Sequence, residues 1–118
     1  MAFLFGSAAK GRAIRRSDLD IAVHFSDGYD VRDVVSLAGE LERLLGRDVD
    51  VIVLNSAPAT LARTALRGVP LVIRNRRFYM EFMLDVSREA EDFDQLTAEL
   101  WELRRRRRAG LEAIPNGR

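Results

Sequence analysis

The sequence predicts an α/β (α+β) fold, in which helices pack on a small mixed β-sheet and a long helix ends the chain. Three observations support it: short strand-like segments recur along the chain, amphipathic helical segments separate them, and helix-spaced apolar residues run to about residue 108. The strand-like segments are 2–5, 19–25, 49–54 and 69–73. With 118 residues, residues 1–118 are expected to form a single domain.

Composition excludes several classes of protein. Apolar residues make up 47% of the chain, which is typical of a globular domain, and there is no cysteine for a disulfide or a thiol nucleophile. No apolar run is long enough to span a bilayer, and no basic region precedes the apolar start. We therefore expect a soluble, cytoplasmic protein without a membrane partner. A net charge of +1 does not favour nucleic acid as a partner.

The sequence up to residue 25 predicts two strands joined through a turn. Residues 2–5 are an apolar strand, and Gly6-Ser7 then turns the chain into a short helical turn ended by Gly11. Residues 19–25 alternate in polarity, so successive side chains are expected on opposite faces. One face carries Leu19, Ile21, Val23 and Phe25, and the other carries Asp18, Asp20, Ala22 and His24.

The sequence from residue 30 onward predicts helices alternating with strands. Residues 30–45 form an amphipathic helix that Asp30 can cap and Gly46 can end. Its apolar stripe consists of Val31, Val34, Val35, Ala38, Leu41, Leu44 and Leu45. Pro58 suits the first turn of a helix over about 58–67 that Gly68 closes, and Pro70 favours an edge position for the last strand. The apolar spacing over about residues 76–108 predicts one long helix or two broken ones.

Three aspartates on the predicted strands indicate a cation site. Asp18 and Asp20 are two residues apart on a strand, so both carboxylates point the same way and repel each other unless a cation lies between them. Asp50 has apolar neighbours on another strand, where an unpaired charge is costly. If the two strands are adjacent, the three carboxylates converge, and magnesium is the cation that such oxygen ligands prefer.

The Gly6-Ser7 turn supplies a plausible place for phosphate. Glycine lets a phosphate approach the backbone, helix-start N–H groups attract anions, and Ser7 adds a hydroxyl donor. A nucleoside triphosphate with magnesium would fit such a site, and its usual reaction is in-line displacement at phosphorus. Each part has an ordinary alternative, because Gly-Ser turns are common and Asp18, helped by Ser17, can cap a turn. The combination favours a functional site.

These segments resemble a known family. "LFGSAAKG", "SDLDIAVHF" and "VDVIVLN" together resemble the minimal nucleotidyltransferase (MNT) family of the polymerase-beta-like nucleotidyltransferase superfamily, over nearly the whole chain. The resemblance implies the polymerase-beta-like fold, with the nucleotide between the Gly-Ser turn and the aspartates. It assigns magnesium and catalysis to Asp18, Asp20 and Asp50, with Asp50 also helping to deprotonate the acceptor. It assigns nucleotide binding to Gly6, Ser7, Lys10 and Ser17.

The resemblance also implies a function. Many MNT proteins are antitoxins that transfer AMP from ATP to a tyrosine of a HEPN-domain RNase toxin. We therefore expect a Mg²⁺-dependent, ATP-using antitoxin with a HEPN toxin as its partner. The alternatives are an antitoxin that acts by binding alone, transfer to a small molecule, for which 118 residues leave little room, and transfer to RNA, which only the arginine run 104–108 supports.

The chain departs from the family pattern at two places. Family members usually carry arginine directly after the Gly-Ser pair and again two residues later, where this chain has Ala8 and Lys10. Relatives also have a helix ahead of the first strand, which we expect to be missing here because Met1 almost begins that strand.

Other notable residues are expected to be structural. His24 shares the aspartate face but more plausibly makes a strand-end hydrogen bond, and Asp48 is expected to be a capping or solvated residue. The residues Phe78, Tyr79, Phe82 and Met83 have helical spacing typical of core. Trp101 fits either core or a partner surface.

Overall fold

The computed structural model describes residues 1–9, 11 and 19–113, and for residues 7, 8 and 110–113 it describes the backbone alone. Lys10, Ser17 and Asp18 lie outside the described residues. The strands are β1 (Ala2–Phe5), β2 (Leu19–Val23), β3 (Val49–Val53) and β4 (Val69–Val72). The helices are α1 (Gly6–Ala9), α2 (Val31–Leu45), α3 (Ala59–Leu66) and α4 (Arg76–Ala113).

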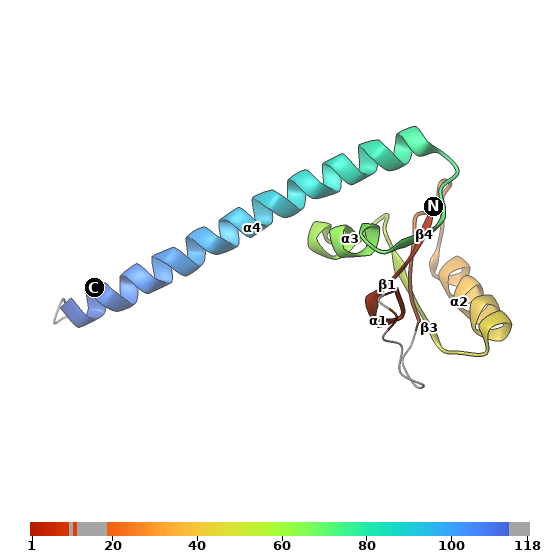
Figure 1. Ribbon diagram of the computed structural model, residues 1–118, viewed down its shortest axis with the longest axis horizontal. Helices are drawn as coiled ribbons and strands as arrows, with labels where there is room; N and C mark the ends of the chain where they lie inside the picture. Colours follow the sequence, from red (N-terminus) through yellow and green to blue (C-terminus); the bar gives the residue numbers. More distant parts are fainter. Residues whose placement is uncertain (10, 12–18, 114–118) are drawn as a thin grey trace.

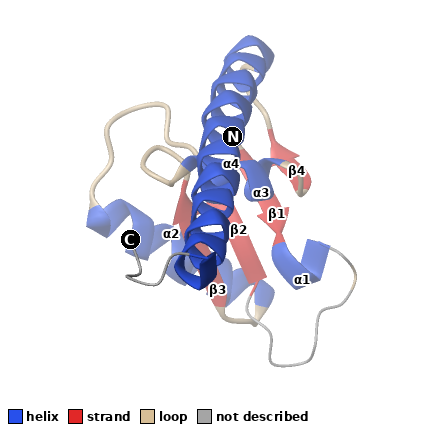
Figure 2. Cartoon of the chain, turned by 90° about the vertical axis from the view of Figure 1, so that its left-hand side faces the viewer, coloured by secondary structure: helices blue, strands red, loops and turns tan. Residues whose placement is uncertain are grey.

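The strands form one mixed sheet in the order β3-β2-β1-β4. β1 pairs antiparallel with β2 and with β4, whereas β2 and β3 are parallel. The predicted mixed sheet with packed helices is therefore confirmed (Figure 2). The edge position favoured by Pro70 is also confirmed, because β4 pairs only with β1 among the described strands.

Local capping chemistry fixes the ends of α2. The Asp30 carboxylate accepts a hydrogen bond from the Asp33 N–H at 3.1 Å, and the Asp33 carboxylate accepts one from the Asp30 N–H at 2.9 Å. This reciprocal pair satisfies two N–H groups that a helix start otherwise leaves without partners. At the other end Gly46 takes the left-handed conformation, with φ of 64°, and donates to the Glu42 carbonyl. Both predicted boundaries are confirmed.

The C-terminal segment is one helix, which decides between the two forms that the sequence left open. α4 has 38 residues and runs from the β4 edge across α3 and out of the globular body (Figure 1). Its first turns pack on the sheet: Tyr79, Phe82 and Met83 contact the core as predicted. The prediction that Phe78 belongs to the core is wrong, since Phe78 is 38% exposed and its ring lies against His24.

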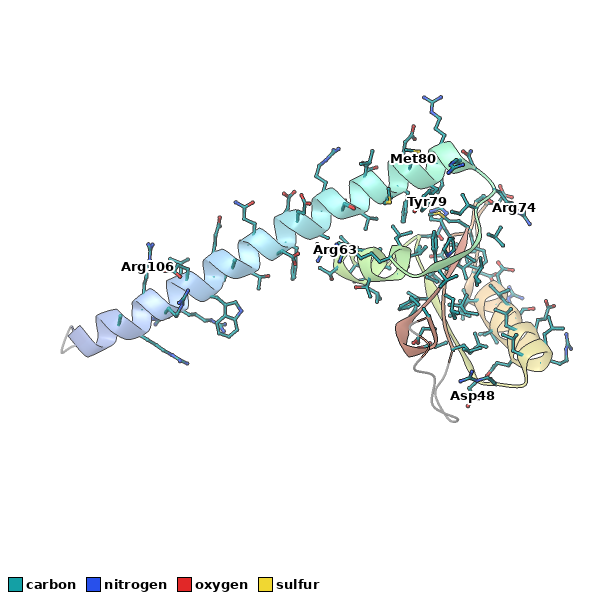
Figure 3. The ribbon with its side chains drawn as sticks, in the orientation of Figure 1. Asp48, Arg63, Arg74, Tyr79, Met80 and Arg106 are labelled. Atoms are coloured by element: carbon teal, nitrogen blue, oxygen red, sulfur yellow. The ribbon has the colours of Figure 1, made fainter. Side chains whose placement is uncertain are left out.

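The main core lies between one face of the sheet and the helices α3 and α4. It contains Phe3, Phe5, Ala22, Leu54, Ala62, Ala65, Leu66 and Val86. The side of α3 that faces the sheet and α4 carries alanines, so α3 can approach both closely without leaving voids. An ion pair then ties the two helices, with Arg63 Nη2 2.8 Å from Asp94 Oδ2. Figure 3 shows Arg63 on α3 directed toward α4, and Tyr79 turned toward the sheet while Met80 points away.

The helix α2 lies on the opposite side of the sheet from α3 (Figure 1). There it contacts β3, and Ile21 of β2 is buried, with 5% of its surface exposed. The apolar stripe predicted for α2 is only half covered: Val31 is 77% exposed, Val35 65% and Leu44 78%. The sheet therefore covers only part of the apolar face that the helical periodicity of α2 marks.

None of the helices in the described part of the chain combines the length and the apolar character needed to span a membrane.

Truncating the buried side chain of Phe3 tests this core. Phe3 is 1% exposed, so Phe3→Ala should lower the free energy of unfolding by about 3–5 kcal/mol through lost burial and a residual cavity. The matched control Leu44→Ala removes a side chain that is 78% exposed and should change it by no more than about 0.5 kcal/mol. Urea unfolding followed by circular dichroism measures both. Equal effects would contradict the placement of the core.

Candidate functional site

The strand register brings Gly6, Asp20 and Asp50 into one row. Phe5, the last residue of β1, pairs with Asp20 on β2, and Asp20 pairs with Asp50 on β3. Neighbouring strands lie about 4.8 Å apart, and paired residues point to the same face of the sheet. The two carboxylates therefore stand side by side, and the turn that follows β1 lies on the other side of Asp20.

Gly6 is held tightly against the Asp20 carboxylate. Its φ is +76°, a backbone conformation that residues other than glycine rarely adopt. A Cβ at this position would overlap Asp20 Oδ2 and lie 3.2 Å from Asp20 Cγ. From the sequence, Gly6 is expected to let a phosphate approach the backbone. The structure shows a second requirement, which is room for a carboxylate beside the turn.

Asp20 and Asp50 differ in their exposure to solvent. Asp20 is half-buried, but Asp50 is exposed. The expectation that Asp50 would be a costly buried charge is wrong, because β3 is an edge strand and α3 lies over the β1 and β2 side of the sheet. Apolar sequence neighbours of Asp50 point to the opposite face, so they do not bury it.

The donor set fits a hard divalent cation. Magnesium takes oxygen ligands and is usually held by one or two carboxylates together with substrate phosphate. Asp20 and Asp50 supply two such carboxylates from adjacent strands. Within the described ranges no three potential ligands come together, and Asp18, the third predicted carboxylate, lies outside those ranges. Ser7 is described as part of α1 by its backbone only.

A hollow of about 360 Å³ adjoins Gly6 on the side away from Asp20. It is lined by Phe5, Gly6, Ala9, Thr64, Arg67, Gly68 and Val69. The sequence does not point to Arg67 or Thr64 as site residues, because Gly68 there indicates only the end of a helix. The usable signal was Gly68: a Cβ there would collide with the Leu4 carbonyl oxygen, so the end of α3 must press on β1 next to the turn.

Two other singled-out residues lie away from this row. His24 is four residues beyond Asp20, about 13 Å along an extended strand, and its ring packs on Phe78 and Phe82 with centroids 4.8 and 5.1 Å away. Its backbone N–H donates to the Met1 carbonyl at 2.9 Å, in keeping with the structural role that was favoured. Asp48 is exposed at the start of β3 (Figure 3), where its carbonyl accepts from the Leu19 N–H at 3.0 Å.

Comparison with known sequences points to one family. Residues 1–77 match the family described as "Polymerase beta, Nucleotidyltransferase". A Methanocaldococcus jannaschii protein, provisionally named a protein adenylyltransferase, is 46% identical over 55 residues, which cover 47% of this chain and 59% of that protein. The protein adenylyltransferase MntA of Thermococcus cleftensis is 38% identical over 69 residues, covering 58% of this chain and 70% of the relative.

Solved structures share the fold. A toxin–antitoxin crystal structure with AMP-PNP superposes with a TM-score of 0.69 at 28% identity, covering 86% of this chain and 80% of that one. The complex of the tri-AMPylated Shewanella oneidensis HEPN toxin with MNT antitoxin superposes with a TM-score of 0.62 at 25% identity. The match covers 86% of this chain and 76% of that one.

The fold is that of a polymerase-beta-like nucleotidyltransferase domain. The chain belongs to the polymerase beta nucleotidyltransferase family, among its MntA-like members. It spans 59% of the length of the Methanocaldococcus relative.

Adding a methyl group at Gly6 tests the contact with Asp20. Gly6→Ala should destabilise the fold by about 1–2 kcal/mol from the left-handed backbone alone, and further through overlap with the carboxylate. Gly39→Ala is the matched control, because Gly39 lies within α2 with nothing within 4 Å of its added Cβ. It should stabilise the protein by about 0.5–1 kcal/mol. Equal shifts in urea unfolding would contradict the geometry at Gly6.

The acid response of stability should depend on His24. Burial, with the charged amino group of Met1 as the smaller cause, lowers the pKa of His24 from its ordinary value of 6.5. The unfolded chain then takes up the proton first, so this contribution to stability is present above pH 6.5 and is lost as pH falls through the folded-state pKa. Unfolding free energies measured between about pH 8 and pH 5 should fall less steeply in His24→Gln. Identical profiles would exclude this origin, since the chain has no other histidine.

Proposed function

We propose that this chain is a Mg²⁺-dependent protein adenylyltransferase that transfers AMP from ATP to a tyrosine hydroxyl of a HEPN-domain toxin and thereby neutralises it. The observation that carries the proposal is the row of Gly6, Asp20 and Asp50: Asp20 pairs with Asp50 across the sheet, and Gly6, the residue after Phe5, lies against the Asp20 carboxylate. The names of the MntA relatives and the AMPylated toxin in a structurally similar complex support the same activity.

The reaction is an in-line displacement at the α-phosphorus of ATP. The tyrosine oxygen forms a bond to that phosphorus, the bond to the β-phosphate bridging oxygen breaks, and pyrophosphate leaves with its electron pair. The hydroxyl proton passes to a carboxylate, and exposed Asp50 is the acceptor that an incoming protein can reach. Bound magnesium would stabilise the charge on the attacking and leaving oxygens.

The remaining roles divide between the two sides of Gly6. On the β2 side, Asp20 and Asp50 hold magnesium together with Asp18, and Ser17 supports the nucleotide from the same segment. On the other side, the turn formed by Gly6 and Ser7 receives the triphosphate, with Lys10, three residues after Ser7 in the sequence, as an additional cation. These assignments rest on the register for Asp20 and Asp50 and on the family pattern for Ser7, Lys10, Ser17 and Asp18.

Arg67 provides a cation where the family pattern has lost one. Ala8 replaces the arginine that usually follows the Gly-Ser pair, and Arg67 lines the hollow next to Gly6 from the end of α3. Its guanidinium group can bind phosphate oxygens in the bidentate manner that arginine favours. We assign it to the triphosphate, so that a neighbouring element compensates for the change at position 8.

Mass spectrometry of the toxin tests the proposal. A HEPN-domain toxin is incubated with this chain, ATP and Mg²⁺, and the intact mass of the toxin should rise by one or more AMP units. Asp20→Asn and Asp50→Asn should each slow the transfer by about a hundredfold or more, the scale for losing one fixed electrostatic contact to the transition state. Asp48→Asn is the matched control, because Asp48 is an exposed carboxylate outside the row.

The outcomes separate two functions. If the Asp48→Asn variant still adds AMP to the toxin and the Asp20→Asn variant does not, the result supports adenylylation by this site. If no mass is added while the toxin RNase is still silenced by the parent and by Asp20→Asn alike, the chain is an antitoxin that acts by binding alone. Equal transfer by all variants would place the active site elsewhere.

A further inference from the structure

The second half of α4 carries an apolar stripe that nothing in the described chain covers. Phe93 is 56% exposed, Leu96 53%, Leu100 52% and Leu103 59%. Figure 1 shows this half of α4 running past α3 into open space. The four residues are spaced three, four and three apart, which is the a/d spacing of a coiled-coil seam. We call residues 89–108 the distal segment of α4.

The distal segment is strongly polarised in charge. Its first part carries Glu89, Glu91, Asp92, Asp94 and Glu99, and its last part is the arginine run 104–108. Few of these charges are neutralised within the described chain: Asp94 pairs with Arg63, and Arg105 and Arg106 pair with Glu102 at 2.6 and 3.4 Å. Arg104 lies over the Trp101 ring, 5.5 Å from its centroid. The acidic end therefore faces solvent, and Arg106 projects from the basic end (Figure 3).

The stripe and the charges have the same symmetry. Phe93 with Leu103, and Leu96 with Leu100, are both centred on position 98. An antiparallel second copy would therefore pack Phe93 on Leu103 and Leu96 on Leu100 across a two-fold axis at that position. The same register brings residues 89–92 of one copy opposite 104–107 of the other, so acidic groups meet arginines at both ends. Such a surface is self-complementary, as a two-fold dimer requires.

A parallel pairing lacks this complementarity. It would place the acidic part against the acidic part and five arginines against five arginines, and facing like charges are destabilising. The apolar seam alone does not fix the direction of a partner helix, whereas the charges do. The other exposed large apolar residues of α4 lie outside the seam: Phe78, Met80, Leu84 and Trp101.

We propose that the distal segment of α4 docks antiparallel against the same segment of a second copy of this chain, with Phe93, Leu96, Leu100 and Leu103 forming the seam. The proposal does not depend on the adenylyltransferase activity, because the row of Gly6, Asp20 and Asp50 lies on another part of the molecule. The dimer holds two globular bodies at opposite ends of a paired helix.

Sedimentation across a concentration series tests the association. The parent chain should behave as a concentration-dependent dimer, and Leu96→Asp with Leu100→Asp should be a monomer of unchanged helical content. Leu44→Asp is the matched control, since Leu44 is an exposed leucine on α2, outside the seam, and this variant should remain dimeric. Raising the salt to about 1 M, where charges are screened within about 3 Å, should weaken the parent dimer by about tenfold.

Cysteine cross-linking tests the direction. The chain has no cysteine of its own, so single cysteines report specific contacts. A mixture of Leu96→Cys and Leu100→Cys should give a disulfide-linked heterodimer, whereas each variant alone should cross-link at least tenfold more slowly. Faster self-linkage of Leu96→Cys would show a parallel pair and overturn the proposal. A chain that is monomeric at all concentrations, or a dimer that survives Leu96→Asp with Leu100→Asp, would overturn it as well.

Discussion

The contact between Gly6 and the Asp20 carboxylate constrains the rest of this structure. β1 must end opposite Asp20, and the chain must reverse there without a side chain, because the carboxylate occupies the space of a Cβ. That requirement fixes the register of β1 on β2, and β1 in turn pairs with β4 and receives the end of α3. One close approach thus sets the positions of two strands and a helix, and it puts a turn beside a charged group.

Core and site occupy the same face of the sheet. Ala22 lies one step along β2 from Asp20 on that face, and it is fully buried beneath the helices, whereas Asp20 is half-buried. The boundary between core and site is therefore where α3 and α4 stop covering the sheet. A charged pair can stand at the end of an apolar face at low cost because water reaches Asp50 at the edge strand. The position of α3 decides both how the core packs and how open the site is.

Local signals in the sequence were sufficient for much of the fold. Asp30 and Gly46 bounded α2 correctly, and Pro70 marked an edge strand, because capping and proline chemistry act over a few residues. Alternation correctly put Asp20 and Ala22 on one face. The exposure of Asp50 and the placement of Arg67 next to Gly6 could not be predicted in this way, since both depend on which strands are at the edge and where α3 ends. The half-covered stripe of α2 has the same origin, because hydrophobic periodicity gives the direction of a face but not the width of its partner.

α4 is divided into a buried half and a projecting half, and substitutions in the two halves have different consequences. Residues such as Val86 and Ala90 hold the domain together, and substitutions there are filtered by folding. Beyond the ion pair of Arg63 with Asp94 the helix no longer supports the core, so substitutions there are filtered only by what the helix binds. This half can change its partners over evolutionary time while the sheet and its row of acidic residues stay intact.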